Sequence, residues 1–440
     1  MPRNLVVVSL DGVSQTLFWQ YRRSMPCLWR MSERSAMFRR FYSAATSSLH
    51  SFCSFVHGDA SELDHNLAYP DARGCLAGRS GNLFAILRKR GYSTLGVQHG
   101  SHCPRYAADN YWGAWPDECD PFQFHVDYAG FHGETKAFLT RAKEQAQPFA
   151  LYFSDRAARP DDASAEKKDA ALYHQRFEKG FSLLDGSVET LLETLSGLEL
   201  LENTIVVFFG PYGMDPMNHR ILAGRFNSGD PYADLSWTPM FIYNNDHDIC
   251  IADQIVSSID LKPTILHMLF PDETQPEAGN PLSGVDILRH HRTMALTQSL
   301  FALERENEGP AKGMARSIAA TDGDQRLIIT SDGNIAGEGG MELYFDSRDP
   351  GNTRDFLDFF TLDPMGYMIA FGREDIVHVH FTQSFKPPLV MSIIASFNRM
   401  RQQLFDSIRF KERAALSLLK TDDGVRLFPE VVFKHKRKRR

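Results

Sequence analysis

Side chains that can bind metals or transfer protons follow three stretches that are typical of buried strands. Asp11 comes directly after the apolar, β-branched run 4–10, His99 ends a short strand after Gly91, and Asp155 ends the run 147–155. In open α/β sheets the carboxyl ends of the strands form the edge where ligands bind. Carboxylates and imidazoles at such an edge can act as ligands or as acids and bases. A lone Asp at a strand end can equally be a turn residue that hydrogen-bonds its own backbone, so both interpretations stay open.

A fourth strand ends differently, in the stretch FFGPYGMD at 208–215. A catalytic turn at this position would offer a carboxylate, an imidazole or a hydroxyl. This turn offers Gly210, Pro211, Tyr212 and Gly213. It is either an ordinary loop or an active-site loop that has lost its chemistry.

The elements that must position these residues alternate between strands and helices. Strands are predicted over 4–10, 147–155, 203–210 and 238–243, and an amphipathic helix over about 171–195. Another helix is predicted at 258–270. This alternation predicts an α/β fold, with a mostly parallel central sheet flanked by helices.

The pattern changes after about residue 310. The stretches 315–333 and 340–347 resemble antiparallel strands joined by Gly/Asp turns, and a helical section is predicted near 388–419. We therefore expect a large α/β domain over 1–310 and a smaller C-terminal α+β subdomain over 311–440.

Composition narrows the class of protein. The chain has 440 residues and a formal net charge of −7, which gives no case for nucleic acid as a partner; the basic terminus 434–440 is typical of a solvated tail. No stretch approaches the roughly 18 apolar residues of a membrane span, and the start lacks the pattern of a signal peptide. We expect a cytoplasmic protein whose six cysteines are reduced thiols.

Several stretches then resemble, in order, one family. The segment 173–210 is similar to the helix–strand unit of sulfatases and related enzymes of the alkaline-phosphatase superfamily, including nucleotide pyrophosphatase/phosphodiesterases. VSSIDLKPTILHMLF (256–270) resembles their DLxPTLL helix, LRKRGYSTLGVQHG (87–100) their GYxTxxxGKWH strand, and MELYFDSRDPGNTRDFL (341–357) the ELYDLxxDPxExxNL signature of their C-terminal subdomain.

The resemblance implies a sheet edge that holds one or two divalent metals, which activate a nucleophile against a sulfate or phosphate ester. Asp11 stands at the family's first metal-ligand Asp, although Gly12 replaces the second Asp of sulfatases; phosphodiesterases also have Asp-Gly there. Asp155 and Arg159 stand where phosphodiesterases place Asp-x-x-x-His, so the carboxylate is kept and the imidazole is not. Asp11 and Asp155 are thus the metal-ligand candidates, for Ca²⁺, Zn²⁺ or Mn²⁺ if the site still functions.

The nucleophile turn corresponds to 42–58, and the spacing to Gly58 selects Ser48. Shifts of one or two residues would select Ser47 or Thr46 instead. The formylglycine pattern of sulfatases is missing, because His50 and Phe52 occupy its Pro and Arg positions. The alternative is a serine-rich helix N-cap without a catalytic role.

Further catalytic candidates also come from the resemblance. His99 matches the histidine of KWH, His219 the histidine of the GDHG-like motif, and Arg225 a substrate-contacting lysine. For each, a purely structural role is the alternative. The metal-ligand Asp-His pair of the family aligns with Pro211 and Tyr212, and Tyr is a poor ligand for a hard cation because its unperturbed pKa is about 10.

Three hypotheses follow. The first is a sulfatase-like protein with a degenerate metal site, which binds a ligand or partner without catalysis. The second is an active hydrolase or transferase of sulfate or phosphate esters that uses Ser48 in a rewired site. The third is an assembly protein, in which the predicted helix 392–410 presents a face for self-association as a homo-oligomer.

Overall fold

A computed structural model describes most of the first 302 residues and parts of the rest. The described ranges are 2–60, 81–100, 115, 119, 122–158, 170–214, 231–245, 250–273, 282–302, 314–332, 340–347, 349–352, 368–371, 377–380 and 399–400. The chain divides into two compact units, the first over Met1–Ser228 and Asp234–Arg292 and the second over Gly229–Ala233 and Thr293–Arg440. The expected domain boundary at residue 310 lies outside the described residues.

The first unit is built on one eight-stranded sheet. In spatial order its strands are β4 (Gln123–His125), β3 (Ser93–His99), β5 (Phe149–Asp155), β1 (Asn4–Leu10), β6 (Thr204–Phe209), β7 (Met240–Tyr243), β2 (Ala36–Tyr42) and β8 (Ile251–Ser257). Neighbouring strands pair in parallel except β7, which is antiparallel to both β6 and β2. The prediction of a mostly parallel sheet is confirmed.

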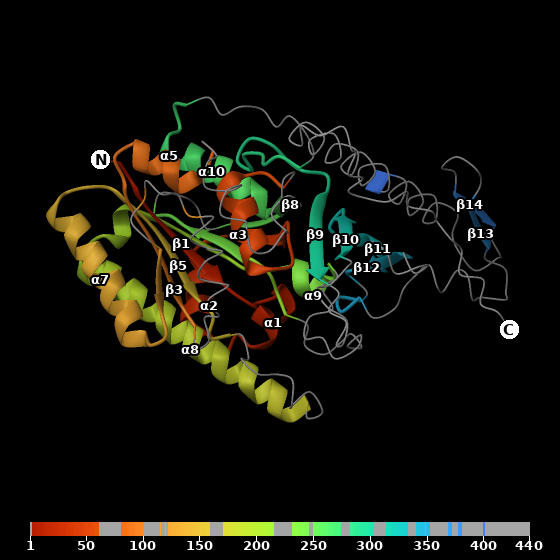
Figure 1. The fold of residues 1–440 in the computed structure, drawn as a ribbon, viewed down its shortest axis with the longest axis horizontal. Coiled ribbons are helices and arrows are strands. Elements are labelled where there is room, and N and C mark those ends of the chain that lie inside the picture. The colour runs from red at the N-terminus through yellow and green to blue at the C-terminus, as the bar shows by residue number, and fades with distance from the viewer. Residues whose placement is uncertain are drawn as a thin grey trace. The chain divides into compact units, whose positions relative to one another are not determined.

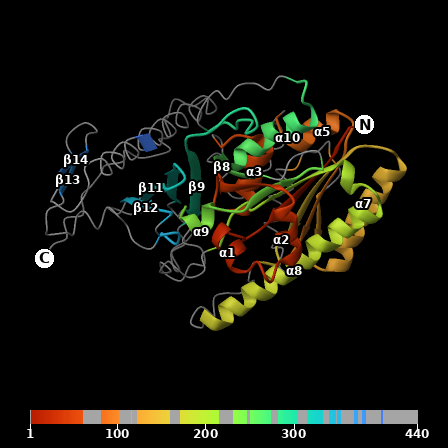
Figure 2. The ribbon, with the colours of Figure 1, turned by 180° about the vertical axis from the view of Figure 1, so that it is seen from behind.

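Helices cover both faces of this sheet (Figures 1 and 2). On one face lie α1 (Gln15–Gln20), α2 (Pro26–Glu33), α7 (Tyr128–Glu144) and α8 (Ala170–Gly197). On the other lie α3 (Ser48–His57), α5 (Leu83–Lys89) and α10 (Leu261–Leu269). Short helices α9 (Ala233–Ser236), η2 (Leu201–Asn203) and η4 (Ser258–Asp260) complete the connections.

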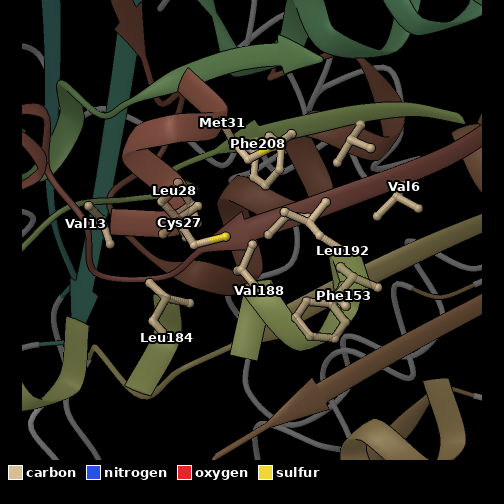
Figure 3. Packing of buried hydrophobic residues seen from close by; sticks show 14 of the residues in the cluster. Val6, Val13, Cys27, Leu28, Met31, Phe153, Leu184, Val188, Leu192 and Phe208 are labelled. Carbon is tan, nitrogen blue, oxygen red and sulfur yellow. The ribbon is translucent and has the colours of Figure 1, made fainter. Parts of the chain in front are cut away.

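Burial on both faces explains why the central strands lack polar alternation, since a sheet covered on each side needs apolar residues throughout. All seven residues of β1 are buried. One face packs Val6 and Phe208 against α2 and against Leu184 and Val188 of α8, as Figure 3 shows. The helical spacing that predicted α8 thus corresponds to its buried side.

The opposite face carries an aromatic core. Tyr152 of β5 lies 4.8 Å from Phe52 of α3, measured between ring centroids, and Phe209 of β6 lies 5.2 Å from Phe55. These contacts hold α3 against the sheet. The second part of the predicted nucleophile turn (42–58) is therefore fixed by packing of its apolar side.

The second unit contains a four-stranded antiparallel sheet in the order β12-β11-β10-β9. Its strands are β9 (Ala295–Ala302), β10 (Met314–Thr321), β11 (Gln325–Asp332) and β12 (Gly340–Phe345), and a separate pair is formed by β13 (Met368–Phe371) and β14 (Val377–His380). The buried guanidinium of Arg326 holds Asp346 through two hydrogen bonds of 3.2 and 2.8 Å. The antiparallel strands predicted at 315–333 and 340–347 are confirmed.

Other predictions fall on parts of the chain that are not described. The C-terminal helix near 388–419 is described only at 399–400, and the basic tail 434–440 lies outside the described residues. No helix in the described ranges is both long and apolar enough to cross a membrane.

Candidate functional site

The register of three neighbouring strands brings the candidate residues to one level of the sheet. Leu10 of β1 pairs with Asp155 of β5, and Asp155 pairs with His99 of β3. Residues paired in this way point to the same face. Asp155 and His99 therefore lie side by side at the carboxyl edge, and Asp11 follows one residue beyond the last pair.

The buried carboxylate of Asp155 holds His99. Its Oδ1 lies 2.9 Å from Nδ1 of His99 and also accepts a hydrogen bond of 2.9 Å from the backbone N–H of Ala157. The Asp155 side chain is fully buried, and that of His99 is 9% exposed. A carboxylate bound to Nδ1 fixes the orientation of an imidazole, which is the arrangement found for oriented bases and for metal-ligating histidines.

Helix α7 covers this pair with aromatic rings. Tyr128 stacks on His99 with 3.9 Å between ring centroids, and His132 stacks on Tyr128 at 5.7 Å. Burial, and next the charge of Asp155, raise the pKa of Tyr128 well above its usual value. Burial lowers the pKa of His132; Asp155 opposes this effect and His99 adds to it.

Asp11 has a different partner, the guanidinium of Arg156. Oδ2 of Asp11 lies 3.7 Å from Nε of Arg156, and Oδ1 accepts a hydrogen bond of 2.8 Å from Ser9. The Asp11 side chain is completely buried, and that of Arg156 is 13% exposed. The backbone N–H of Arg156 donates to the carbonyl of His99 at 3.2 Å, so this residue ties β3 and β5 to the end of β1.

The charge of Asp11 also affects the pKa of Tyr152, which is fully buried. Burial, and next Asp11, raise the pKa of this phenol well above its usual value, whereas Ser9, Ser154 and Arg156 act in the opposite direction. Asp11 and Arg156 thus lie close enough to the same phenol to act on it with opposite signs.

The turn after β1 and the loop after β6 pack tightly against each other. Gly12 has a φ of 81°, and a Cβ placed on it would lie 2.9 Å from Sδ of Met214. Its N–H donates to the carbonyl of Tyr212 at 3.2 Å. A second aspartate at position 12, as in sulfatases, would meet both a left-handed backbone and a close sulfur atom.

The glycines of the loop are required by close approach. A Cβ on Gly213 would lie 2.0 Å from the carbonyl oxygen of Asp234, and one on Gly210 would lie 2.6 Å from Cβ of Thr238. Gly213 N–H donates to Leu235 at 2.8 Å. The turn GPYG is therefore held in place by the α9 region as well as by the turn after β1.

Tyr212 is a core residue. It is 2% exposed and belongs to the apolar cluster between the sheet and helices α2 and α8. Its hydroxyl makes no hydrogen bond to any described residue. The side chain of Tyr212 thus contributes to packing. The carbonyl of Pro211 accepts a hydrogen bond from Ser43.

Helix α3 begins at Ser48, whose backbone is described and whose side chain is not. Ser47 stands at the N-cap position, yet its hydroxyl contacts Nδ1 of His50 at 2.6 Å and caps no backbone N–H. Thr46 is buried. Two further candidates, His219 and Arg225, lie outside the described residues, and so does Arg159.

A helix glycine supports the loop that carries Arg156. A Cβ on Gly180 of α8 would lie 2.5 Å from the carbonyl oxygen of Ala157 and 3.0 Å from Cα of Ala158. Glycine is unfavourable within a helix, by about 1 kcal/mol relative to alanine. Its presence lets the long helix approach the chain directly after Asp155 and Arg156.

The described residues do not fit a divalent metal. Such ions need several carboxylate, imidazole or carbonyl ligands. Within the described ranges no group of three or more His, Cys, Asp and Glu side chains is arranged to hold one. Asp11 is ion-paired with Arg156, Gly12 offers no side chain, and Tyr212 packs in the core.

Sequence reasoning missed two contributors, Arg156 and Tyr128. Arg156 follows Asp155 directly, so the register of β5 beside β1 places it opposite Asp11. The sequence does show a basic residue, Arg156, one position after a predicted strand. Its pairing with Asp11 could be inferred only if β1 and β5 were known to be neighbours. Tyr128 belongs to no motif that the sequence offered.

The fold is that of an α/β protein whose mostly parallel sheet is covered by helices on both faces. The sulfatase family model matches residues 3–269 of the chain. The chain belongs to the sulfatase family.

Solved structures agree at the level of the fold. A putative sulfatase from Bacteroides thetaiotaomicron is 14% identical, with a TM-score of 0.64 over 95% of this chain and 94% of that one. An alkaline-phosphatase-superfamily protein from Vibrio parahaemolyticus is 10% identical, with a TM-score of 0.55 over 94% and 88%. A third structure, solved with its substrate D-glucosamine-2-N,6-O-disulfate, is 14% identical, with a TM-score of 0.58 over 81% and 93%.

Proposed function

We propose that this chain is a sulfatase-family protein with a degenerate metal site, which binds a ligand or partner and does not catalyse metal-dependent ester hydrolysis. One observation carries the proposal: the loop after β6 has Pro211 and Tyr212 at the positions of the family's Asp-His pair, and Tyr212 is buried in the apolar core. A phenol packed in this way offers no ligand to a hard cation from position 212.

The loss of the Asp-His ligand pair also argues against metal-dependent catalysis. Ester hydrolysis in this family relies on metal charge to neutralise the ester oxygens and to activate the nucleophile. A single carboxylate, already paired with Arg156, seldom holds a divalent ion tightly. We infer a sulfate or phosphate ester, with sulfated sugars as the first class to test, as the ligand that such a site would bind without turnover.

The metal content of the purified protein tests this proposal. The full chain is loaded in turn with Ca²⁺, Zn²⁺ and Mn²⁺, desalted and measured by elemental mass spectrometry, and assayed for turnover of an aryl sulfate and a phosphodiester. We expect no stoichiometric metal and no turnover. A stoichiometric metal that is lost in Asp11→Ala, together with turnover that chelation abolishes, would overturn the proposal.

A second candidate function is an active hydrolase or transferase of the same esters with a rewired site. The observation in its favour is the Asp155–His99 pair, which has the geometry of an oriented base. In this hypothesis Ser48 is the nucleophile, with His219 and Arg225 as further catalytic residues. Turnover that survives chelation and is abolished by Ser48→Ala would support it; turnover unchanged in that variant would exclude it.

A further inference from the structure

In relatives that bind a metal, the metal ion balances the negative charge of the aspartate at this position. In this chain the charge of Asp11 has to be balanced as well. The Asp11 carboxylate is fully buried at the end of β1. A buried carboxylate without a compensating charge or hydrogen bonds is strongly unfavourable. Ser9 gives one hydrogen bond to Oδ1, but a hydroxyl carries no net charge. A cation near Oδ2 would balance the carboxylate charge directly.

Arg156 supplies a cation at that place. Its Nε is 3.7 Å from Oδ2 of Asp11, and its side chain is largely buried. A guanidinium stays protonated throughout the range in which proteins are folded, so this charge is permanent. The backbone of Arg156 is fixed by its hydrogen bond to His99 and by the close packing of Gly180 against Ala157.

We propose that Arg156 is the resident counter-ion of Asp11 and takes the place of the divalent metal at this edge of the sheet. The site is thereby assembled without any metal ion. This inference rests on the proposed function in one respect, since it requires that no metal occupies Asp11. It goes further in naming the residue that replaces the metal and in assigning it a measurable effect on the fold.

Thermal unfolding of the full chain tests the proposal, with the wild type and variants measured in EDTA and in excess Ca²⁺, Mn²⁺ or Zn²⁺. The wild-type Tm is expected to be the same in all four conditions. Arg156→Gln and Asp11→Asn each remove one charge of this buried ion pair, and each is expected to lower Tm by on the order of 5 °C or more. The double variant is expected to lose clearly less than the sum of the two single losses, because neither charge then remains.

Two further variants serve as controls. Arg156→Lys keeps a positive charge and is expected to retain more of the wild-type Tm than Arg156→Gln. Arg39→Gln removes an arginine from an exposed ion pair with Asp253, whose side chains are 50% and 58% exposed, and is expected to leave Tm nearly unchanged. Losses that simply add in the double variant, or an Arg156→Gln variant that behaves like Arg39→Gln, would overturn the inference.

The two proposals can fail separately. Ester turnover in EDTA with an unchanged Tm would refute ligand binding without turnover, in favour of the second candidate function, and leave the role of Arg156 intact. Additive losses in the double variant without turnover would refute only the role of Arg156. A wild-type Tm that falls in EDTA and recovers with a divalent ion, along with metal-dependent turnover, would refute both.

Discussion

His99 and Asp155 are paired in the register of β3 and β5, and their side chains are also in contact, with 2.9 Å between Nδ1 and Oδ1. Loss of the carboxylate leaves the imidazole buried without its partner and frees the N–H of Ala157. We expect Asp155→Ala to lower the free energy of unfolding by about 2–3 kcal/mol, measured by urea denaturation. Asp253→Ala, at an exposed position, serves as the control; equal effects of the two variants would argue against a structural role for the pair.

The burial of Tyr212 predicts what happens when the family's Asp-His metal ligands are put back at positions 211 and 212. The double variant Pro211→Asp/Tyr212→His introduces polar groups at a core position, and Arg156 still pairs with Asp11. We expect it to be less stable and to gain no stoichiometric metal in elemental analysis. Tyr212→Phe is the matched control: its hydroxyl has no partner in the described part of the chain, so stability should change little. Tight metal binding by the double variant would contradict this assignment.

The close approach at Gly213 predicts a large effect of one methyl group. Gly213→Ala would place a Cβ 2.0 Å from the carbonyl oxygen of Asp234, so the loop must move or the protein must lose stability. Gly186 lies inside α8 with open space at its Cβ, and Gly186→Ala is expected to stabilise by about 0.5–1 kcal/mol. Chemical denaturation of both variants checks the opposite signs; a stable Gly213→Ala protein would show that the loop is not constrained.

Asp185 of α8 provides a pH-dependent prediction. Its carboxylate accepts hydrogen bonds from the N–H groups of Leu28 at 2.8 Å and Cys27 at 3.0 Å, at the start of α2, where Met25 provides no side-chain cap. Burial raises the pKa of Asp185, and the two backbone hydrogen bonds partly oppose that rise. The folded state therefore holds this proton more tightly than the unfolded chain, whose pKa is about 3.9.

Stability from this group is then greatest below pH 4 and declines as the pH rises through the folded-state pKa. The difference in unfolding free energy between the wild type and Asp185→Asn should shrink from pH 4 to pH 7 in urea titrations. Asp253 has the opposite shift, because its hydrogen bond from Arg39 lowers its pKa. Its Asn variant should show the opposite slope, and two slopes of the same sign would contradict the assignment.

Continuous apolar runs made much of the sheet predictable. The runs at 4–10, 147–155 and 203–210 became β1, β5 and β6, because strands buried on both faces need no polar positions. Strand β2 escaped prediction, since the exposed residues Arg39 and Arg40 interrupt its pattern where the register with β8 shifts.

The site was predictable only where a strand end marked it. Asp11, His99 and Asp155 were found in this way, and the structure brings His99 and Asp155 into contact. The pairing of Asp11 with Arg156 depends on which strand lies beside β1, and that order is a long-range property that local patterns do not contain. The stacking of Tyr128 on His99 likewise depends on how α7 packs.

The glycine at position 180 has a consequence for how substitution data on this protein would be understood. In a survey of every single substitution, Gly180 should tolerate change as poorly as a reactive side chain, because any Cβ meets the backbone of Ala157. Intolerance at this position would result from the close approach of α8 to the loop after β5. A map of intolerant positions in this fold therefore traces spacing as well as chemistry, and the two have to be separated before a residue is assigned a role.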